Sequence, residues 1–250
     1  MSDERDGGPD EFDFYPCLVD DGPASIYVNL KYERERPPAD TRYTLAIRMR
    51  EPDTHGIGTS DETGALNLVE EAAIAKAGEL SITFVGRIRT RGIWEIVLYG
   101  PAGHVDALHA VVHERVGDRR IEIRSAADPT WTYYRELLLP DAERRQWMDD
   151  RRLVQVLREQ GDVLVTPRRV DHWASFATAA DRDAFVTAVT ANGFALAEAS
   201  HDKSERPFGA WVHRVDPIEL DHIHDVVMTL VDAALAHDGV YDGWETSIEG

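Results

Sequence analysis

The sequence predicts an α+β protein of two tandem ferredoxin-like α/β sandwich domains with mainly antiparallel sheets. Its 250 residues are enough for two domains of ordinary size. Each half of the chain shows the same order of elements, namely paired strands, a helix, paired strands and a second helix. Proline and a charged run, Leu139-Pro140-Asp141 followed by AERRQWMDDRR, separate the two hydrophobic patterns. We therefore predict an N-terminal α+β domain over residues 1–141 and a second domain over residues 142–250.

The N-terminal half begins with an acidic segment without hydrophobic periodicity, and we expect residues 1–12 to be a disordered tail. Two strand-like runs, 25–31 and 43–50, flank a charged turn with Pro37-Pro38 and predict a hairpin. Thr59 and Glu62 have capping-box spacing and predict a helix start. This helix is predicted to end at Gly78, and strands 80–88 and 92–99 follow it. A second helix then runs through Val105, Leu108 and Val112 to Gly117, before a last strand at 120–124. We expect the aromatic segment with Trp131, Tyr133 and Tyr134 to pack on this domain.

The second half begins with a predicted helix through Leu153, Val156 and Leu157 that ends at Gly161. Thr178 and Asp181 predict the start of the next helix, and Asn192-Gly193 its left-handed end. For the last helix the sequence suggests Asp216 as N-cap, Pro217 in the first turn and Glu219 in the capping-box position. The predicted strands of this half are 163–166, 170–176, 194–200 and 209–215.

Composition and charge exclude several classes of protein. No stretch approaches the roughly 20 apolar residues of a membrane span, and the acidic start lacks the features of a secretion signal. The net charge of −19 is shared, with 25 acids against 16 bases in residues 1–140 and 21 against 11 in residues 141–250. Such a surface repels phosphate backbones and attracts a basic partner, although the same acidity also serves solubility. The single cysteine, Cys17, fits a reducing compartment, so we expect a cytoplasmic protein that does not bind nucleic acid directly.

Several features of the C-terminal half together resemble a known family. They are His172, Trp173 and Phe176 in one strand, Phe185 in a helix, the Gly193-Phe194 restart, Trp211, and the ending Asp238-Gly239-Val240-Tyr241-Asp242-Gly243-Trp244-Glu245-Thr246. From about residue 152 to 249 the chain resembles the RraB family, regulators of ribonuclease E activity. The N-terminal half is similar to a bacterial domain family of unknown function that is often found ahead of an RraB-like domain. The RraB resemblance implies a non-catalytic regulatory protein that acts by binding the scaffold region of a ribonuclease E-like enzyme, to which an arginine-rich segment would bring positive charge. The N-terminal domain is a departure from the family, because the short regulator itself lacks it.

Two groups of residues are candidates for contact with that partner. Asp221, Asp225 and Asp232 share one side of the last helix, opposite Ile223, Val227 and Leu230, where they could attract a basic segment or simply be its solvated face. Tyr241 and Trp244 could be exposed anchors for a partner or could seal the domain core.

Other functions remain as alternatives. Tandem domains of this kind can bind a small ligand between them. A metal-dependent hydrolase would need the histidines, yet His109 and His113 lack the glutamate of an HExxH motif, and His222 and His224 point about 200° apart on a helix. The loop 55–60 could hold an anion, and Arg87, Arg89 and Arg91 could contact RNA from one side of a strand. No nucleophile motif is present, so the sequence predicts no catalytic residue, metal or cofactor and leaves the oligomeric state open.

Overall fold

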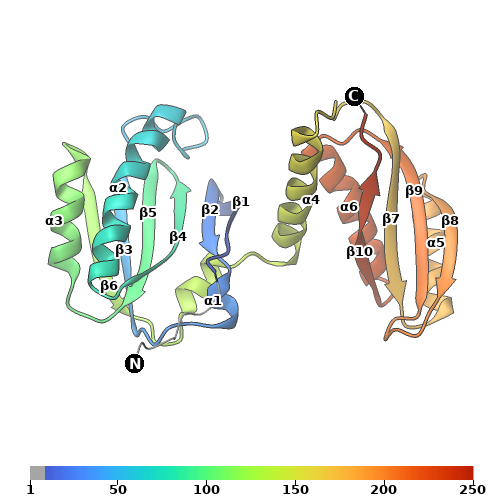
Figure 1. The fold of residues 1–250 in the computed structure, drawn as a ribbon, viewed down its shortest axis with the longest axis horizontal. Helices are drawn as coiled ribbons and strands as arrows, with labels where there is room; N and C mark the ends of the chain where they lie inside the picture. The colour runs from blue at the N-terminus through green and yellow to red at the C-terminus, as the bar shows by residue number, and fades with distance from the viewer. Residues whose placement is uncertain (1–8, 250) are drawn as a thin grey trace. The chain divides into compact units, whose positions relative to one another are not determined.

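The computed structural model describes residues 9–249. The chain divides between Arg144 and Arg145 into two compact units, each with its own sheet and hydrophobic core. Both units mix helices with antiparallel strands, so the predicted α+β class is confirmed (Figure 1).

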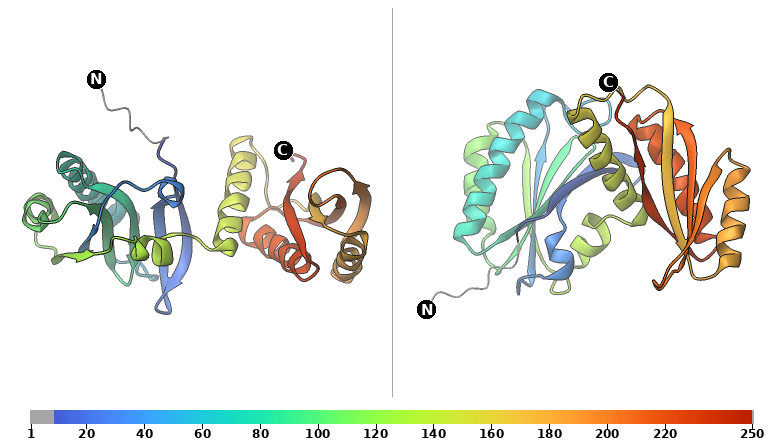
Figure 2. Two further views of the ribbon diagram at one scale, coloured as in Figure 1. Left: turned by 90° about the horizontal axis from the view of Figure 1, so that it is seen from below. Right: turned by 45° about the vertical axis from the view of Figure 1, so that its right-hand side comes forward.

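The N-terminal domain is built around a ferredoxin-like unit. Its elements run β3 (Thr41–Arg48), α2 (Ser60–Glu79), β4 (Thr83–Thr90), β5 (Ile93–Gly100), α3 (Val105–Val116) and β6 (Ile121–Ala127). The strand order β4-β5-β3-β6 with antiparallel neighbours is that of the β-α-β-β-α-β motif. Helices α2 and α3 pack on one face of this sheet (Figure 2). Thr59 caps α2 as predicted, because its side chain accepts a hydrogen bond from the Glu62 amide at 3.3 Å.

An additional hairpin extends this sheet, and it replaces the hairpin that the sequence predicted. β1 (Phe12–Val19) pairs with β2 (Gly22–Asn29), which in turn pairs with β4, so the predicted hairpin of 25–31 with 43–50 does not form. The Pro37-Pro38 segment, preceded by the short helix α1 (Lys31–Arg34), instead carries the chain across to β3. Most of the predicted tail lies outside the described residues, but Phe12 already belongs to β1.

The aromatic segment after β6 packs on the N-terminal domain, as the sequence predicts. Trp131 and Tyr134 are buried, and the chain between them leads into the π-helical turn η1 (Tyr134–Leu138). Trp131 stacks on Tyr99 with ring centroids 4.1 Å apart, and the Tyr134 hydroxyl donates to the carbonyl of Asn29 at 2.6 Å. This segment therefore covers part of the sheet face opposite α2 and α3.

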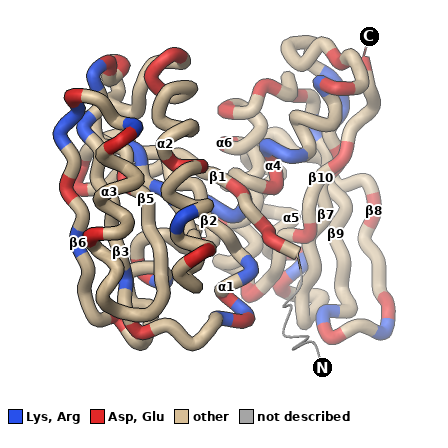
Figure 3. Tube along the Cα trace, turned by 60° about the vertical axis from the view of Figure 1, so that its left-hand side comes forward, with Lys and Arg blue, Asp and Glu red and all other residues tan. Residues whose placement is uncertain are grey.

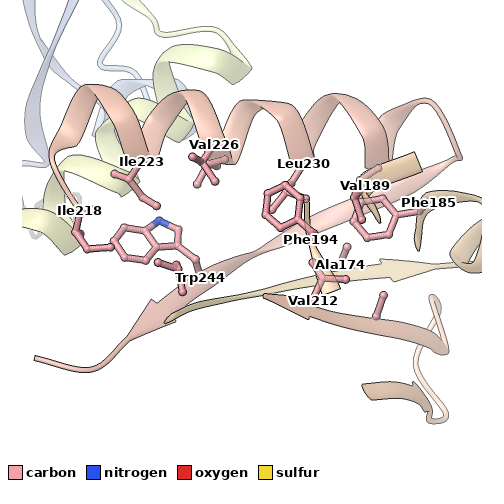
Figure 4. Packing of buried hydrophobic residues seen from close by; sticks show 14 of the residues in the cluster. Ala174, Phe185, Val189, Phe194, Val212, Ile218, Ile223, Val226, Leu230 and Trp244 are labelled. Carbon is pink, nitrogen blue, oxygen red and sulfur yellow. The ribbon is translucent and has the colours of Figure 1, made fainter. Parts of the chain in front are cut away.

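The C-terminal domain is a second ferredoxin-like unit. After α4 (Ala142–Glu159) come β7 (Arg168–Phe176), α5 (Ala179–Thr190), β8 (Ala195–His201), β9 (Phe208–Asp216), α6 (Leu220–Leu235) and β10 (Gly239–Thr246). The strand order is β10-β7-β9-β8, with every neighbouring pair antiparallel. Figure 4 shows α6 lying across the sheet, with Ile223, Val226 and Leu230 packed toward Trp244, Val212 and Phe194.

Three boundaries in this half differ from the predictions. The charged run 141–152, which separates the two hydrophobic patterns in the sequence, forms the first turns of α4. Most of its acids and bases are exposed or partly exposed, whereas Asp150 is buried. Residues 163–166 form a turn and not a strand. Asp216 ends β9 instead of capping α6, whose N-cap position is Glu219 without a side-chain hydrogen bond.

Candidate protein-binding surface

The acidic side of α6 is exposed along its length. Asp221, Asp225 and Asp232 are all solvent-exposed, whereas the residues opposite them, Ile223, Val227 and Leu230, are buried in the core. Acidic residues are spread over both domains (Figure 3). On α6, three of them lie within about 40° of one another around the helix axis, because they are four and seven residues apart. The helix can therefore present a line of three carboxylates to a basic segment.

Trp244 lies in the core and not on the surface. Only 8% of it is exposed, and its indole packs among the residues of α6 (Figure 4). Its Nε1 donates a hydrogen bond of 2.9 Å to Oδ1 of Asp150, a carboxylate on α4 that is 1% exposed. The sequence left two alternatives for Trp244, an exposed anchor for a partner or a residue that seals the core, and the structure places it in the core.

Asp150 is the centre of a buried polar cluster. Besides Trp244, it accepts a hydrogen bond from Gln146 at 3.0 Å and is 2.8 Å from Nδ1 of His224 on α6. Burial raises the pKa of Asp150 above its usual value, although the hydrogen bonds from His224, Trp244 and Gln146 oppose this effect. These bonds connect α4, α6 and β10, so the cluster fixes the first helix of the domain to its last strand.

Tyr241 forms a second polar link beneath α6. It is partly buried, and its hydroxyl lies 2.9 Å from Nδ1 of His172, which is fully buried in β7. Burial lowers the pKa of His172 to about 4, so this imidazole is neutral at neutral pH. Tyr241 is therefore held by the domain itself and offers only part of its side chain to a partner.

The histidines do not assemble a metal site within residues 9–249. No group of three histidine, cysteine or acidic side chains is close enough to hold an ion in that part of the chain. His109 and His113 stack on each other on α3, with ring centroids 5.6 Å apart. His222 bonds to Asp216 at 2.9 Å, while His224 is bound to Asp150. The hydrolase alternative therefore has no arrangement of ligands to support it in the described structure.

The N-terminal domain holds two candidate anion-binding sites, the arginines of one strand and the loop 55–60, and in both the binding groups already contact other groups of the protein. Arg87 lies on the face covered by α2, where it forms a 3.0 Å ion pair with the buried Glu70. In the loop 55–60, the carboxylate of Asp53 accepts hydrogen bonds from the amides of His55 and Ile57 at 3.0 and 2.9 Å. Arg89 donates hydrogen bonds to the hydroxyls of Thr63 and Ser25, and Arg91, although exposed, donates to the carbonyl of Asp20. The three arginines therefore bind groups of their own domain, and the loop amides already hold a carboxylate.

Two features of the C-terminal domain were missed by the sequence reasoning. Asp150 lies inside a charged run, and charge alone gives no sign that one of its acids is buried. The outward face of β7 and β9, with Asp171, Trp173 and Trp211, could have been found from the alternation of residues 168–176, in which every second side chain is buried.

Comparison with known families agrees with the division of the chain. Residues 10–139 match the model of a family of unknown function, DUF695. The chain belongs to this family. Residues 147–246 match the model of Regulator of ribonuclease activity B, RraB. The chain thus carries a DUF695 domain followed by an RraB-like domain, and the RraB match supports a regulator of ribonuclease activity.

Other comparisons add little to this result. No curated protein matches the chain. One similar solved structure, an unknown protein from Galdieria sulphuraria, is 9% identical, with 82% of this chain and 96% of that chain covered at a TM-score of 0.24. Another, described as a "putative glycine cleavage system transcriptional repressor", is 8% identical, with 84% and 100% covered at a TM-score of 0.26. Scores this low support no conclusion on function. Among residues 9–249, no helix is both long and apolar enough to cross a membrane.

Proposed function

We propose that this protein is a non-catalytic, cytoplasmic regulator that inhibits a ribonuclease E-like enzyme by binding a basic segment of it through the acidic C-terminal domain. The match of residues 147–246 to the RraB model carries the proposal. The exposed carboxylates of Asp221, Asp225 and Asp232 support it, because a line of negative charge suits a partner rich in arginine and lysine. The formal charge of residues 141–250, 11 bases against 21 acids, has the same sign as this surface.

The physical role of the three aspartates is long-range attraction. Exposed charges mainly raise the rate of encounter, and salt screens them over a Debye length of about 8 Å at physiological ionic strength. Changing the three aspartates to asparagine keeps the shape of the helix while it removes three charges. We expect this variant to associate more slowly with the partner and to show a weaker dependence on salt, with an unchanged melting temperature.

Kinetic binding measurements at low and high salt test the proposal, with the basic non-catalytic segment of a ribonuclease E as the immobilised partner. A control with the same loss of charge is available in the N-terminal domain, where Asp61→Asn, Glu71→Gln and Asp106→Asn change three exposed acids. The control should associate nearly as fast as the wild-type chain. An unchanged association rate and salt slope for the α6 variant would show that this side of the helix is only a solvated surface.

A further inference from the structure

The sheet of the C-terminal domain has one face that α5 and α6 do not cover. Along β7, buried and partly exposed side chains alternate, and Val170, His172 and Ala174 point into the core beneath the helices. The intervening residues belong to the opposite face: Arg169, Asp171, Trp173 and Ser175. From the neighbouring strands, this face also receives Trp211, Glu198 and Asp242. We call it the open sheet face.

Two tryptophans lie side by side on the open sheet face. Trp173 and Trp211 are directly opposite in the β7–β9 register, and their rings stack with centroids 5.8 Å apart and planes 27° apart. Trp211 is fixed in place, because its Nε1 donates a hydrogen bond of 2.7 Å to Oδ1 of Asp171. Both rings are only partly buried. An exposed, oriented pair of indoles is a surface on which a planar or cationic group can stack.

The surroundings of the pair are acidic. Trp173 and Trp211 line an open hollow of about 640 Å³ whose charged lining residues are four acids and one base, namely Glu198, Asp202, Glu205, Asp242 and Arg206. The base is engaged within the chain, since the guanidinium of Arg206 donates to the backbone carbonyl of Asp238. A cation that entered the hollow would therefore meet an excess of carboxylates.

The domain already shows, with its own residues, how an arginine fits this face. The guanidinium of Arg169 lies over the Trp211 ring, 5.7 Å from its centroid, and its Nε and Nη2 bind the carboxylate of Asp171 at 2.7–3.1 Å. Trp173 has the same neighbours, an indole and carboxylates, but no cation from residues 9–249 lies over its ring. Arginine suits such a site better than lysine, because its planar group can stack and hydrogen-bond at once.

We infer that the open sheet face binds an arginine-rich extended segment of a protein partner, with one arginine stacked on Trp173 and paired with the carboxylates of the hollow. This inference rests on the proposed function, since it gives the basic partner segment a second place to bind beside the α6 aspartates. Single-stranded RNA, which also stacks on aromatic rings, is disfavoured because four acids would repel its phosphates.

The test uses the full chain and a fluorescein-labelled synthetic peptide of alternating arginine, glycine and serine, with fluorescence anisotropy as the readout. Trp173→Leu keeps an apolar side chain but removes the aromatic ring, and we expect the Kd to rise about five- to thirty-fold. The same peptide with lysine for arginine should also bind more weakly than the arginine peptide. As a matched control, Trp147→Leu removes an indole of α4 that likewise has an arginine, Arg151, near its ring, and it should leave the Kd unchanged.

Glu198→Gln with Asp242→Asn provides a second variant that leaves the core untouched, and it should weaken peptide binding even if Trp173→Leu proves unstable. Loss of affinity in the sheet-face variants, with melting temperatures kept, supports the inference. It is overturned if the wild-type chain does not bind the arginine peptide, if only the α6 aspartate variant loses affinity, or if an oligouridine binds and the peptide does not. In the first two cases the inference about the sheet face is wrong, but the proposed function is tested separately, by whether the protein inhibits the ribonuclease.

Discussion

Replacement of Trp244 by alanine should unfold the C-terminal domain at a much lower temperature. The indole is 8% exposed and packs among Ile218, Ile223 and Val226, and truncation of a buried tryptophan to alanine costs about 3–5 kcal/mol. In a domain of about 100 residues, 1 kcal/mol shifts the melting temperature by about 4–8 °C. The transition of this domain should therefore fall by at least about 12 °C.

Calorimetry of the full chain measures this effect, because the two domains have separate cores and only one transition should move. Trp244→Phe refines the test: it keeps most of the packing but removes the donor to Asp150, at a cost of about 1–3 kcal/mol. Val240→Ala is the control, since it shortens an exposed side chain of the same strand and should change stability by less than about 0.5 kcal/mol. A Trp244→Ala transition within about 2 °C of the wild type would refute the placement of this residue in the core.

Three further predictions concern pH, domain independence and metal content. Burial lowers the pKa of His172 in the folded chain to about 4, against 6.5 for the free side chain. The neutral imidazole therefore contributes about 3 kcal/mol to the free energy of unfolding above about pH 6.5, and this contribution is lost as the pH falls toward 4. His172→Gln should flatten the dependence of unfolding free energy on pH in that window, and urea titrations in which the wild-type slope persists in the variant would contradict this assignment. Residues 142–250 expressed alone should give a soluble product with a cooperative thermal transition; an insoluble or unfolded product would count against autonomous domains. Elemental analysis of the purified chain should find no stoichiometric transition metal, and a zinc ion released only on unfolding would return the hydrolase alternative to consideration.

The parts of the fold that could be predicted from sequence are those with strong local signals. The helix start at Thr59, the helix start at Thr178 and the turn at Gly193 all carry capping or turn chemistry that depends on a few neighbouring residues. The predicted order of elements led to the ferredoxin-like class, but the observed unit in each half is β-α-β-β-α-β and not two paired strands before each helix. In the C-terminal half a strand was predicted at 163–166, where none forms, and β10 was missed.

The missed features depend on contacts between distant residues. β1 was not found because its acidic surroundings suggest disorder, whereas Tyr15 within it is buried and donates to the carbonyl of Leu138 at 2.9 Å. Asp150 lies in the charged run that separates the two hydrophobic patterns, and the run itself does not indicate burial. Trp244, 94 residues later in the chain, supplies one of its hydrogen bonds. The spacing of Asp221, Asp225 and Asp232 within one helix, by contrast, was enough to predict that they share an exposed side.

Inhibition can be measured directly as the rate at which a purified ribonuclease E-like enzyme, with its basic non-catalytic segment intact, cleaves a fluorescent RNA substrate in the presence of this protein. We predict that the wild-type chain slows cleavage in a dose-dependent manner, and that the variant with Asp221, Asp225 and Asp232 changed to asparagine needs a higher concentration for the same effect, most clearly at low salt. Deletion of the basic segment from the enzyme should abolish the inhibition. A cleavage rate that does not change with a large excess of the folded wild-type chain would contradict the proposal that this protein regulates such an enzyme by binding it.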